Sequence, residues 1–334
     1  MTDQVFNVGV DVGGTNIKLG ITNENGSILL QDKIKTGVER GSDAIILSII
    51  EGIHALLAKA SLPRGHVRSI GVGVPGTVDS EAGIVVYAPN IFWKNVAISS
   101  VIQDAFSVPV DIAQDTRAAA WAEYLVGAAR DSRGVAAITL GTGVGCGMVI
   151  DGKIFHGALN TAGEFGHQIV ELNGTPCNCG RRGCLEAYAG GPAIVGQAIR
   201  LIPSIDVILQ KNNEEIGVDD VYRLAQEGNS PARQLTNRVV TCIGVGFVNL
   251  LNLTAVDVIC ISGGISNAPA ELLLDPLVAF VRERAYVGAS GKVRICKSPL
   301  GEDAPMIGAS LLYRQFSDDR ISKQRPAAAP SAKR

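Results

Sequence analysis

Two glycine-rich segments of similar pattern lie about half a chain apart, and together they restrict the possible folds more than any other feature. The first, residues 10–22, reads VDVGGTNIKLGIT, and the second, residues 138–150, reads ITLGTGVGCGMVI. Each has a β-rich run, a glycine turn and a second β-rich run, which predicts a β-hairpin. Alignment without a gap matches Gly13 with Gly141. The repeat indicates two related domains, although glycine-rich β sequence can also produce such similarity by chance.

Strands and helices alternate along the rest of the chain, which predicts an α/β fold. A strand is expected at 108–112, and VDVICIS, from Val256, predicts a second buried strand that ends in Gly263-Gly264. The helical patterns cover residues 42–60, 192–201, 218–227 and 231–252. Residues 317–334 are rich in Pro, Ala and charge and have no periodicity, so we expect a disordered tail there.

Composition and charge exclude several classes of function. The 334 residues include 30 basic and 32 acidic side chains without long runs of one sign, so neither nucleic acid nor an anionic membrane is an expected partner. The first residues do not read as a secretory signal, and no apolar run is long enough to span a bilayer. Four of the seven cysteines are scattered singly, which argues against a disulfide scaffold. We therefore expect a soluble cytoplasmic protein that binds small ligands.

Glycine turns bind phosphate when their backbone N–H groups converge on one point, since glycine has no Cβ to block the ligand. Three turns qualify, at 13–14, 141–143 and 263–264. Neither hairpin turn has the GKS or GKT ending of a Walker loop, and neither precedes the helix that a Rossmann turn requires. Asp11 would hold Mg²⁺ through its water shell, and Thr15 adds a hydroxyl donor. An ordinary hairpin remains the alternative for each turn alone, but together they predict a nucleotide cleft.

Asp115 follows VPVDIAQ at the start of a helix-favouring run. Aspartate is a favoured N-cap there, worth about 1 kcal/mol relative to alanine. A carboxylate after a strand also faces the edge where open α/β sheets bind ligands. Beside an aligned hydroxyl, Mg²⁺ and phosphate-binding turns, it would accept the proton during phosphoryl transfer to an alcohol. The pattern leaves both roles open, and one position can serve both.

A short window supplies one imidazole and three thiols, from His167, Cys177, Cys179 and Cys184. This set suits tetrahedral Zn²⁺, and the loop NGTPCNCGRRGC is rich in residues that form turns. With four protein ligands the site would be closed, so we expect a structural zinc ion and not a zinc hydrolase. Incidental free thiols are the alternative.

The chain resembles the ROK family, named for repressors, open reading frames and kinases. The motifs that carry the resemblance are, in order, DVGGTN, GVPG, LGTGVGCG, DGK, GEFGHQIV with CNCGRRGCLEAYAGG, and SGGIS, and the match runs from about Val8 to APMIGASLL near residue 312. The resemblance implies the actin-like ATPase (ribonuclease H-like) fold, in which two related α/β domains flank a cleft for ATP and sugar. We accordingly expect an N-terminal domain at 1–115, completed by a helix at 303–316, and a larger C-terminal domain at 116–302 that carries the zinc loop.

The resemblance also implies a role for each matching position. Asp115 matches the catalytic base, and His167 matches a residue that ligates zinc and also holds a sugar hydroxyl. Gln114 departs from the family, which usually has Asn there, and its longer side chain puts the sugar preference in doubt. The sugar-binding positions are Gly76, Asn90, Gln114, Asp115, Glu164, His167 and Glu186. The phosphate and nucleotide positions are Asp11, Gly13, Gly14, Thr15, Gly141, Thr142, Gly143, Gly263 and Gly264.

Residues and resemblance together predict an ATP-dependent hexose kinase, in the first place a glucokinase, that phosphorylates the C6 hydroxyl with the help of Mg²⁺ and carries structural Zn²⁺. N-acetylglucosamine, N-acetylmannosamine, fructose and allose are alternative acceptors, and polyphosphate is an alternative donor. A sugar-sensing transcriptional regulator is not expected, because the phosphate motif begins about ten residues into the chain and leaves no room for the helix-turn-helix domain of such family members. We expect a homodimer that works in carbohydrate metabolism, at the entry to glycolysis.

Overall fold

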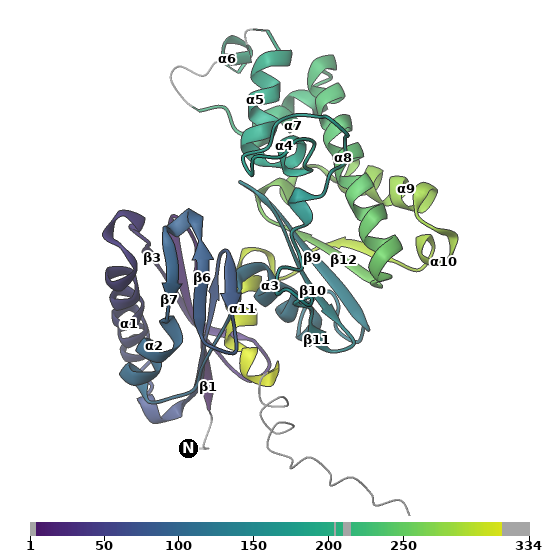
Figure 1. The fold of residues 1–334 in the computed structure, drawn as a ribbon. Coiled ribbons are helices and arrows are strands. Elements are labelled where there is room, and N and C mark those ends of the chain that lie inside the picture. The colour runs from purple at the N-terminus through teal and green to yellow at the C-terminus, as the bar shows by residue number, and fades with distance from the viewer. Residues whose placement is uncertain (1–4, 204, 210–214, 316–334) are drawn as a thin grey trace, which may run out of the picture. The chain divides into compact units, whose positions relative to one another are not determined.

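The computed structural model describes residues 5–203, 205–209 and 215–315. The chain divides into two compact units: the first runs to Ala118 and resumes at Pro305, and the second is the continuous segment Ala119–Ala304. Each unit contains one five-stranded sheet with helices packed on it (Figure 1). The tail expected at 317–334 lies outside the described residues.

The sheet of the first unit has the strand order β3-β2-β1-β4-β8. Its first three strands form an antiparallel meander, and the other two lie parallel to β1. A small antiparallel sheet accompanies it, with the order β5-β6-β7. The strands are β1 (Phe6–Val12), β2 (Asn16–Thr22), β3 (Ile28–Lys35), β4 (Val67–Val74), β5 (Thr77–Asp79), β6 (Ile84–Ala88), β7 (Trp93–Val96) and β8 (Val110–Gln114).

Helices cover both faces of this sheet. Alternating side chains of β1 such as Val8 and Val10 share one hydrophobic core with Ile45 and Ile49 of α1 (Ser42–Lys59) and with residues of α2 (Ile98–Phe106). The opposite face carries a row of three glycines in register, Gly20 of β2, Gly9 of β1 and Gly71 of β4. Helix α11 (Ala304–Ser310) lies on this row, with Met306 against Gly9 and Gly20 and the backbone of Ala309 against Gly71.

The sheet of the second unit repeats this plan with the order β11-β10-β9-β12-β13. Three strands again form an antiparallel meander, and two more lie parallel to its first strand. The strands are β9 (Gly134–Leu140), β10 (Val144–Ile150), β11 (Lys153–Ile154), β12 (Val258–Ser262) and β13 (Arg294–Lys297). The helices are α4 (Glu186–Ala189), α5 (Gly191–Leu201), α6 (Ile205–Ile208), α7 (Val218–Gln226), α8 (Ser230–Thr254), α9 (Leu274–Arg284) and α10 (Val287–Ser290), while α3 (Asp115–Leu125) spans the boundary between the units.

The two predicted hairpins are the pairs β1-β2 and β9-β10, but their turns differ by one residue. Val12 pairs with Ile17, which leaves four residues in the first turn. Leu140 pairs with Val144, which leaves three in the second. Alignment of the two segments without a gap is therefore wrong beyond the turn, because side chains on the second strand shift by one position.

Candidate functional site

Three parallel strands of the first sheet end at the same edge, and predicted site residues follow each of them. Asp11 of β1 lies opposite Gly73 of β4, and Gly73 lies opposite Ala113 of β8. Asp115 comes two residues after Ala113, where β8 gives way to α3. The structure therefore brings Asp11 and Asp115 to one edge of one sheet, where loops after parallel strands form ligand sites in α/β proteins.

The carboxyl group of Asp115 is partly buried and makes one local bond. Its Oδ1 accepts a hydrogen bond of 2.7 Å from the N–H of Thr116. An N-cap side chain would accept from the N–H two or three residues further on, so the bond is not the usual capping bond. Burial raises the pKa of Asp115 above the ordinary aspartate value, and the bond from Thr116 opposes this only in part. A raised pKa makes the ionised carboxylate a stronger base.

Two hydrogen bonds from Thr36 fix the backbone of the first glycine turn, Gly13–Thr15. The hydroxyl of Thr36 donates to the carbonyl of Gly13 at 2.7 Å, and the N–H of Thr36 donates to the carbonyl of Thr15 at 3.1 Å. Gly14 and Thr15 remain exposed. The turn thus has a fixed backbone, and Gly14 and Thr15 are the residues that it leaves accessible to a ligand.

The predicted sugar positions of the first unit lie near this edge. Gly76 follows β4 with a φ of 88°, and its Cα packs against the backbone of Tyr87 and Ala88, so glycine is required there for backbone reasons alone. Asn90 is exposed, and its carbonyl lies 3.8 Å from where a Cβ on Gly14 would stand. Gln114 is the last residue of β8 and pairs with Val74 at the end of β4.

In the second unit, β9 and β12 also end at one edge, and both predicted turns lie there. Ser262 pairs with Thr139, after which Gly141–Gly143 and Gly263–Gly264 follow their strands. A pocket of about 390 Å³ opens at this edge. It is lined by Gly141, Thr142, Gly191, Pro192, Val218, Asp219, Gly264, Ile265 and Asn267. The structure thus brings residues of the Gly141–Gly143 turn and of the Gly263–Gly264 turn to a single pocket.

Sequence reasoning missed the other wall of this pocket. Gly191 and Pro192 begin α5, and Val218 and Asp219 begin α7. The N–H of Gly191 donates to the carbonyl of Gly141 at 2.8 Å, which fixes α5 against the turn. The sequence does predict the start of α5, because proline is common at the first position of a helix. Nothing in the local sequence indicates that this helix start lies against Gly141.

The predicted sugar residues of the second unit gather beside the first half of β10. Glu164 precedes a 3₁₀ turn, Phe165–His167, and both Glu164 and His167 are exposed. The flanking Gly163 and Gly166 pack against the backbone carbonyls of Cys146 and Val144 on β10. Glu186, the first residue of α4, meets the same strand, because its Oε2 accepts a 2.9 Å hydrogen bond from the N–H of Val144.

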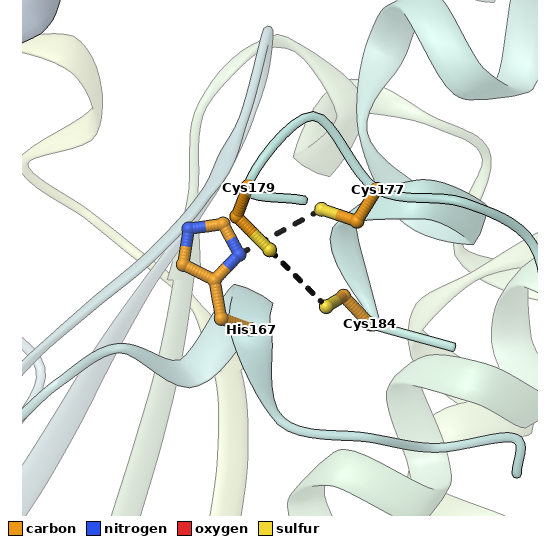
Figure 2. Close-up of side chains that lie close together, drawn as sticks. All are labelled: His167, Cys177, Cys179 and Cys184. Carbon is orange, nitrogen blue, oxygen red and sulfur yellow. Dashed lines mark hydrogen bonds between the residues drawn. The ribbon is translucent and has the colours of Figure 1, made fainter. Parts of the chain in front are cut away.

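The four predicted metal ligands converge, as Figure 2 shows. Their ligand atoms all lie within 4.8 Å of one another. His167 Nδ1 lies 3.8 Å from Cys177 Sγ, and Cys179 Sγ lies 3.6 Å from Cys184 Sγ. Ligand atoms around a tetrahedral zinc ion are about 3.5 to 3.8 Å apart, given bond lengths of roughly 2.1 Å to nitrogen and 2.3 Å to sulfur. The residues therefore fit Zn²⁺ in number and chemistry, and these two pairs of ligand atoms also fit it in spacing.

A short hairpin presents the three thiols. Pro176 bridges to Arg182, and inside that bridge the N–H of Cys177 donates to the carbonyl of Arg181 at 2.8 Å. A second bridge joins Ile169 to Cys184 and brings the segment after His167 alongside. Burial raises the pKa of Cys184 to about 12, so this sulfur becomes a ligand only for a cation that can displace its proton.

Across the described ranges, no helix combines the length and the apolar character that membrane crossing requires.

Comparison with known proteins finds similarity over nearly the whole chain. The model of the ROK family matches residues 7–316. A glucokinase of Thermotoga maritima is 33% identical over 313 residues, which cover 92% of this chain and 97% of that protein. A xylose repressor of Caldicellulosiruptor bescii is 28% identical, over 90% of this chain and 76% of that one.

Among solved structures, a ROK family glucokinase from Streptomyces griseus in complex with glucose and AMPPNP superimposes with a TM-score of 0.78. It is 30% identical, and the match covers 93% of this chain and 99% of that chain. The repeated sheet plan and this superposition confirm the expected actin-like ATPase fold. The extent of the family match and the identity to its members establish that the chain belongs to the ROK family.

Proposed function

We propose that this protein is an ATP-dependent hexose kinase with glucose as its preferred acceptor. The observation that carries the proposal is the partly buried carboxyl group of Asp115, whose pKa is raised, at the same sheet edge as Asp11 and the first glycine turn. The relatives named glucokinase support the same activity, as does the related structure that holds glucose and AMPPNP. In cells we propose a cytoplasmic homodimer that supplies sugar phosphate to glycolysis.

In the proposed reaction Asp115 acts as the general base. Its Oδ1 accepts the bond from Thr116, which leaves Oδ2 to take the proton of the C6 hydroxyl. The C6 oxygen bonds to the γ-phosphorus while the bond from that phosphorus to the β-γ bridging oxygen breaks, and the products are glucose 6-phosphate and ADP. The two glycine turns would donate backbone N–H groups to the phosphates.

Each unit has residues that are proposed to bind the nucleotide. Gly13, Gly14 and Thr15 are proposed to bind phosphate in the first, and Gly141, Thr142 and Gly143 in the second. Gly263 and Gly264, with the pocket of about 390 Å³, are proposed to hold the adenosine. Asp11 would hold Mg²⁺, for which carboxylate oxygen is a suitable ligand, and the ion when bound would neutralise charge on the phosphates.

Sugar binding is proposed for Gly76, Asn90, Gln114, Glu164, His167 and Glu186. Zinc would be structural and would fix the orientation of His167. Because Nδ1 of that ring faces the thiols, Nε2 would be the atom that meets a sugar hydroxyl. The metal would thus stabilise the loop and the tautomer of His167 without taking part in the chemistry.

An assay of ADP release tests the activity directly. Glucose, other hexoses and N-acetylhexosamines are each supplied with ATP and then with polyphosphate, and glucose with ATP is expected to give the highest kcat/KM. The Asp115→Asn variant should lower kcat by about 10² to 10⁴-fold while the dissociation constant for glucose stays within about twofold. Asp104→Asn removes an exposed carboxylate on α2 and is the matched control. Near-normal turnover by Asp115→Asn would refute the proposed base, and no turnover on any sugar would favour a sugar sensor instead.

A further inference from the structure

Glu186 contacts the second phosphate turn directly. Its Oε2 accepts the 2.9 Å bond from Val144, the residue that follows the Gly141–Gly143 turn. A Cβ on Gly143 would stand 2.7 Å from that same oxygen, so the carboxylate lies against the last residue of the turn. A charged acceptor bonded to a backbone N–H is among the stronger hydrogen bonds in proteins. The side chain therefore fixes the end of the turn.

The segment that begins with Glu186 also holds the other end of the turn. The backbone carbonyl of Glu186 accepts a 2.9 Å hydrogen bond from the N–H of Gly190, and this bond closes α4. The next residue, Gly191, donates its N–H to the carbonyl of Gly141 at 2.8 Å. One short segment, Glu186–Gly191, is thus bonded to both ends of the turn, and exposed Thr142 lies between the two attachments.

The negative charge of Glu186 lies beside a turn that is proposed to bind phosphate. A carboxylate beside a phosphate-binding turn repels a nucleotide, so its presence needs a compensating benefit. The bond to Val144 supplies one, because it restrains the turn whose N–H groups are proposed to bind phosphate. The other oxygen, Oε1, has no hydrogen-bond partner within the described residues and stays available to a sugar hydroxyl.

We propose that Glu186 is a positioning residue for the nucleotide as well as a sugar ligand, an inference that rests on the proposed kinase function. One carboxylate would use Oε2 to shape the phosphate turn and Oε1 to bind the acceptor. Loss of the side chain would then weaken nucleotide binding even when no sugar is present. A residue that served the sugar alone would leave that affinity unchanged.

The test is calorimetric titration of the full chain with ADP and Mg²⁺ in the absence of sugar. Glu186→Ala should raise the dissociation constant for ADP about tenfold, as expected for the loss of one charge-assisted hydrogen bond. Glu186→Gln keeps an acceptor for the N–H of Val144 and removes the negative charge, so its dissociation constant should stay at or below that of the wild type. Glu164→Ala is the matched control, since Glu164 is a second proposed sugar ligand that has no bond to the turn.

The outcomes separate this inference from the proposed function. Wild-type protein that binds ADP, together with an unchanged dissociation constant in Glu186→Ala, overturns the positioning role and leaves the kinase proposal intact. Wild-type protein that binds no ADP overturns both. If Glu186→Ala does not fold, Glu186→Asp replaces it, because the shorter side chain keeps the charge but withdraws the carboxylate from Val144. That variant should also weaken ADP binding, and wild-type affinity in it would contradict the inference.

Discussion

Gly263 packs directly on the backbone of Leu140, and this contact joins the end of β12 to the end of β9. A Cβ on Gly263 would collide with the Leu140 carbonyl, and its φ of 86° is itself unfavourable for other residues. Gly263→Ala should therefore cost about 1 to 3 kcal/mol of stability and weaken ADP binding. Gly264→Ala is the control for stability, because a Cβ there meets nothing within 4 Å. Thermal denaturation of both variants checks this, and equal melting temperatures would count against the contact.

The raised pKa of Asp115 has opposite consequences for activity and stability. A base works only when ionised, so kcat/KM should fall on the acid side with an apparent pKa above the ordinary aspartate value of about 3.9. Replacement of Asp115 by Asn should abolish this dependence along with most of the turnover. A profile that stays flat down to pH 4 would show that another group is the base.

For stability the sign follows from proton binding. Because the folded-state pKa of Asp115 is raised, the folded protein holds this proton more tightly than the unfolded chain, so its contribution to stability is lost as pH rises above the unfolded value of about 3.9. Asp115→Asn removes that penalty. The variant should therefore melt at a higher temperature than the wild type at pH 8, and the difference should shrink toward pH 4. A lower melting temperature at pH 8 would contradict the burial argument.

Removal of one thiol from the proposed zinc site should release the metal. Cys179→Ser should contain less than one zinc ion per chain, and a stability loss of about 2 kcal/mol would lower the melting temperature by about 4 to 8 °C. The KM for glucose should rise about tenfold, since His167 loses its fixed orientation. Cys296→Ser, far from the four ligands in sequence, is the control and should keep the full zinc content in elemental analysis. Wild-type protein purified without zinc would refute the site.

The side chain of Gln114 is expected to influence which sugar the protein prefers. It ends β8 next to Asp115, and the longer amide is expected to reach a different hydroxyl from the Asn that the family usually carries. Gln114→Asn should change the ratio of kcat/KM between glucose and N-acetylglucosamine by about tenfold, as one methylene group can in a binding pocket. The KM for ATP should not move. An unchanged ratio across the sugar panel would exclude Gln114 from acceptor selection.

Features that depend on local sequence were predictable. Residues 42–60 fold as α1 to within one residue, because apolar side chains repeat at the helical period and Lys59 precedes a break. The two hairpins and the cluster of His167, Cys177, Cys179 and Cys184 follow from turn residues and ligand types that act over short distances. Such patterns contain enough information to predict an element or a ligand set.

Features that depend on contacts between distant segments were not predictable from local pattern. The bond from Gly191 to Gly141 joins residues fifty positions apart, and nothing in either segment signals the other. In the sequence, Gly20, Gly9 and Gly71 are isolated glycines that weaken the strands in which they lie. Only strand pairing shows that they form one row. The one-residue difference between the two glycine turns is likewise decided by strand pairing and not by composition.

The helix that covers the same glycine row is made late in synthesis of the chain. This helix, α11, is synthesised after the entire segment Ala119–Ala304. The second unit is continuous in sequence and can therefore finish folding first, although β1 to β8 leave the ribosome earlier. During that interval the sheet face that carries Gly20, Gly9 and Gly71 lacks the helix that covers it in the complete protein. Because Met306 and Ala309 cover this row, the first unit is complete only when its C-terminal segment is present.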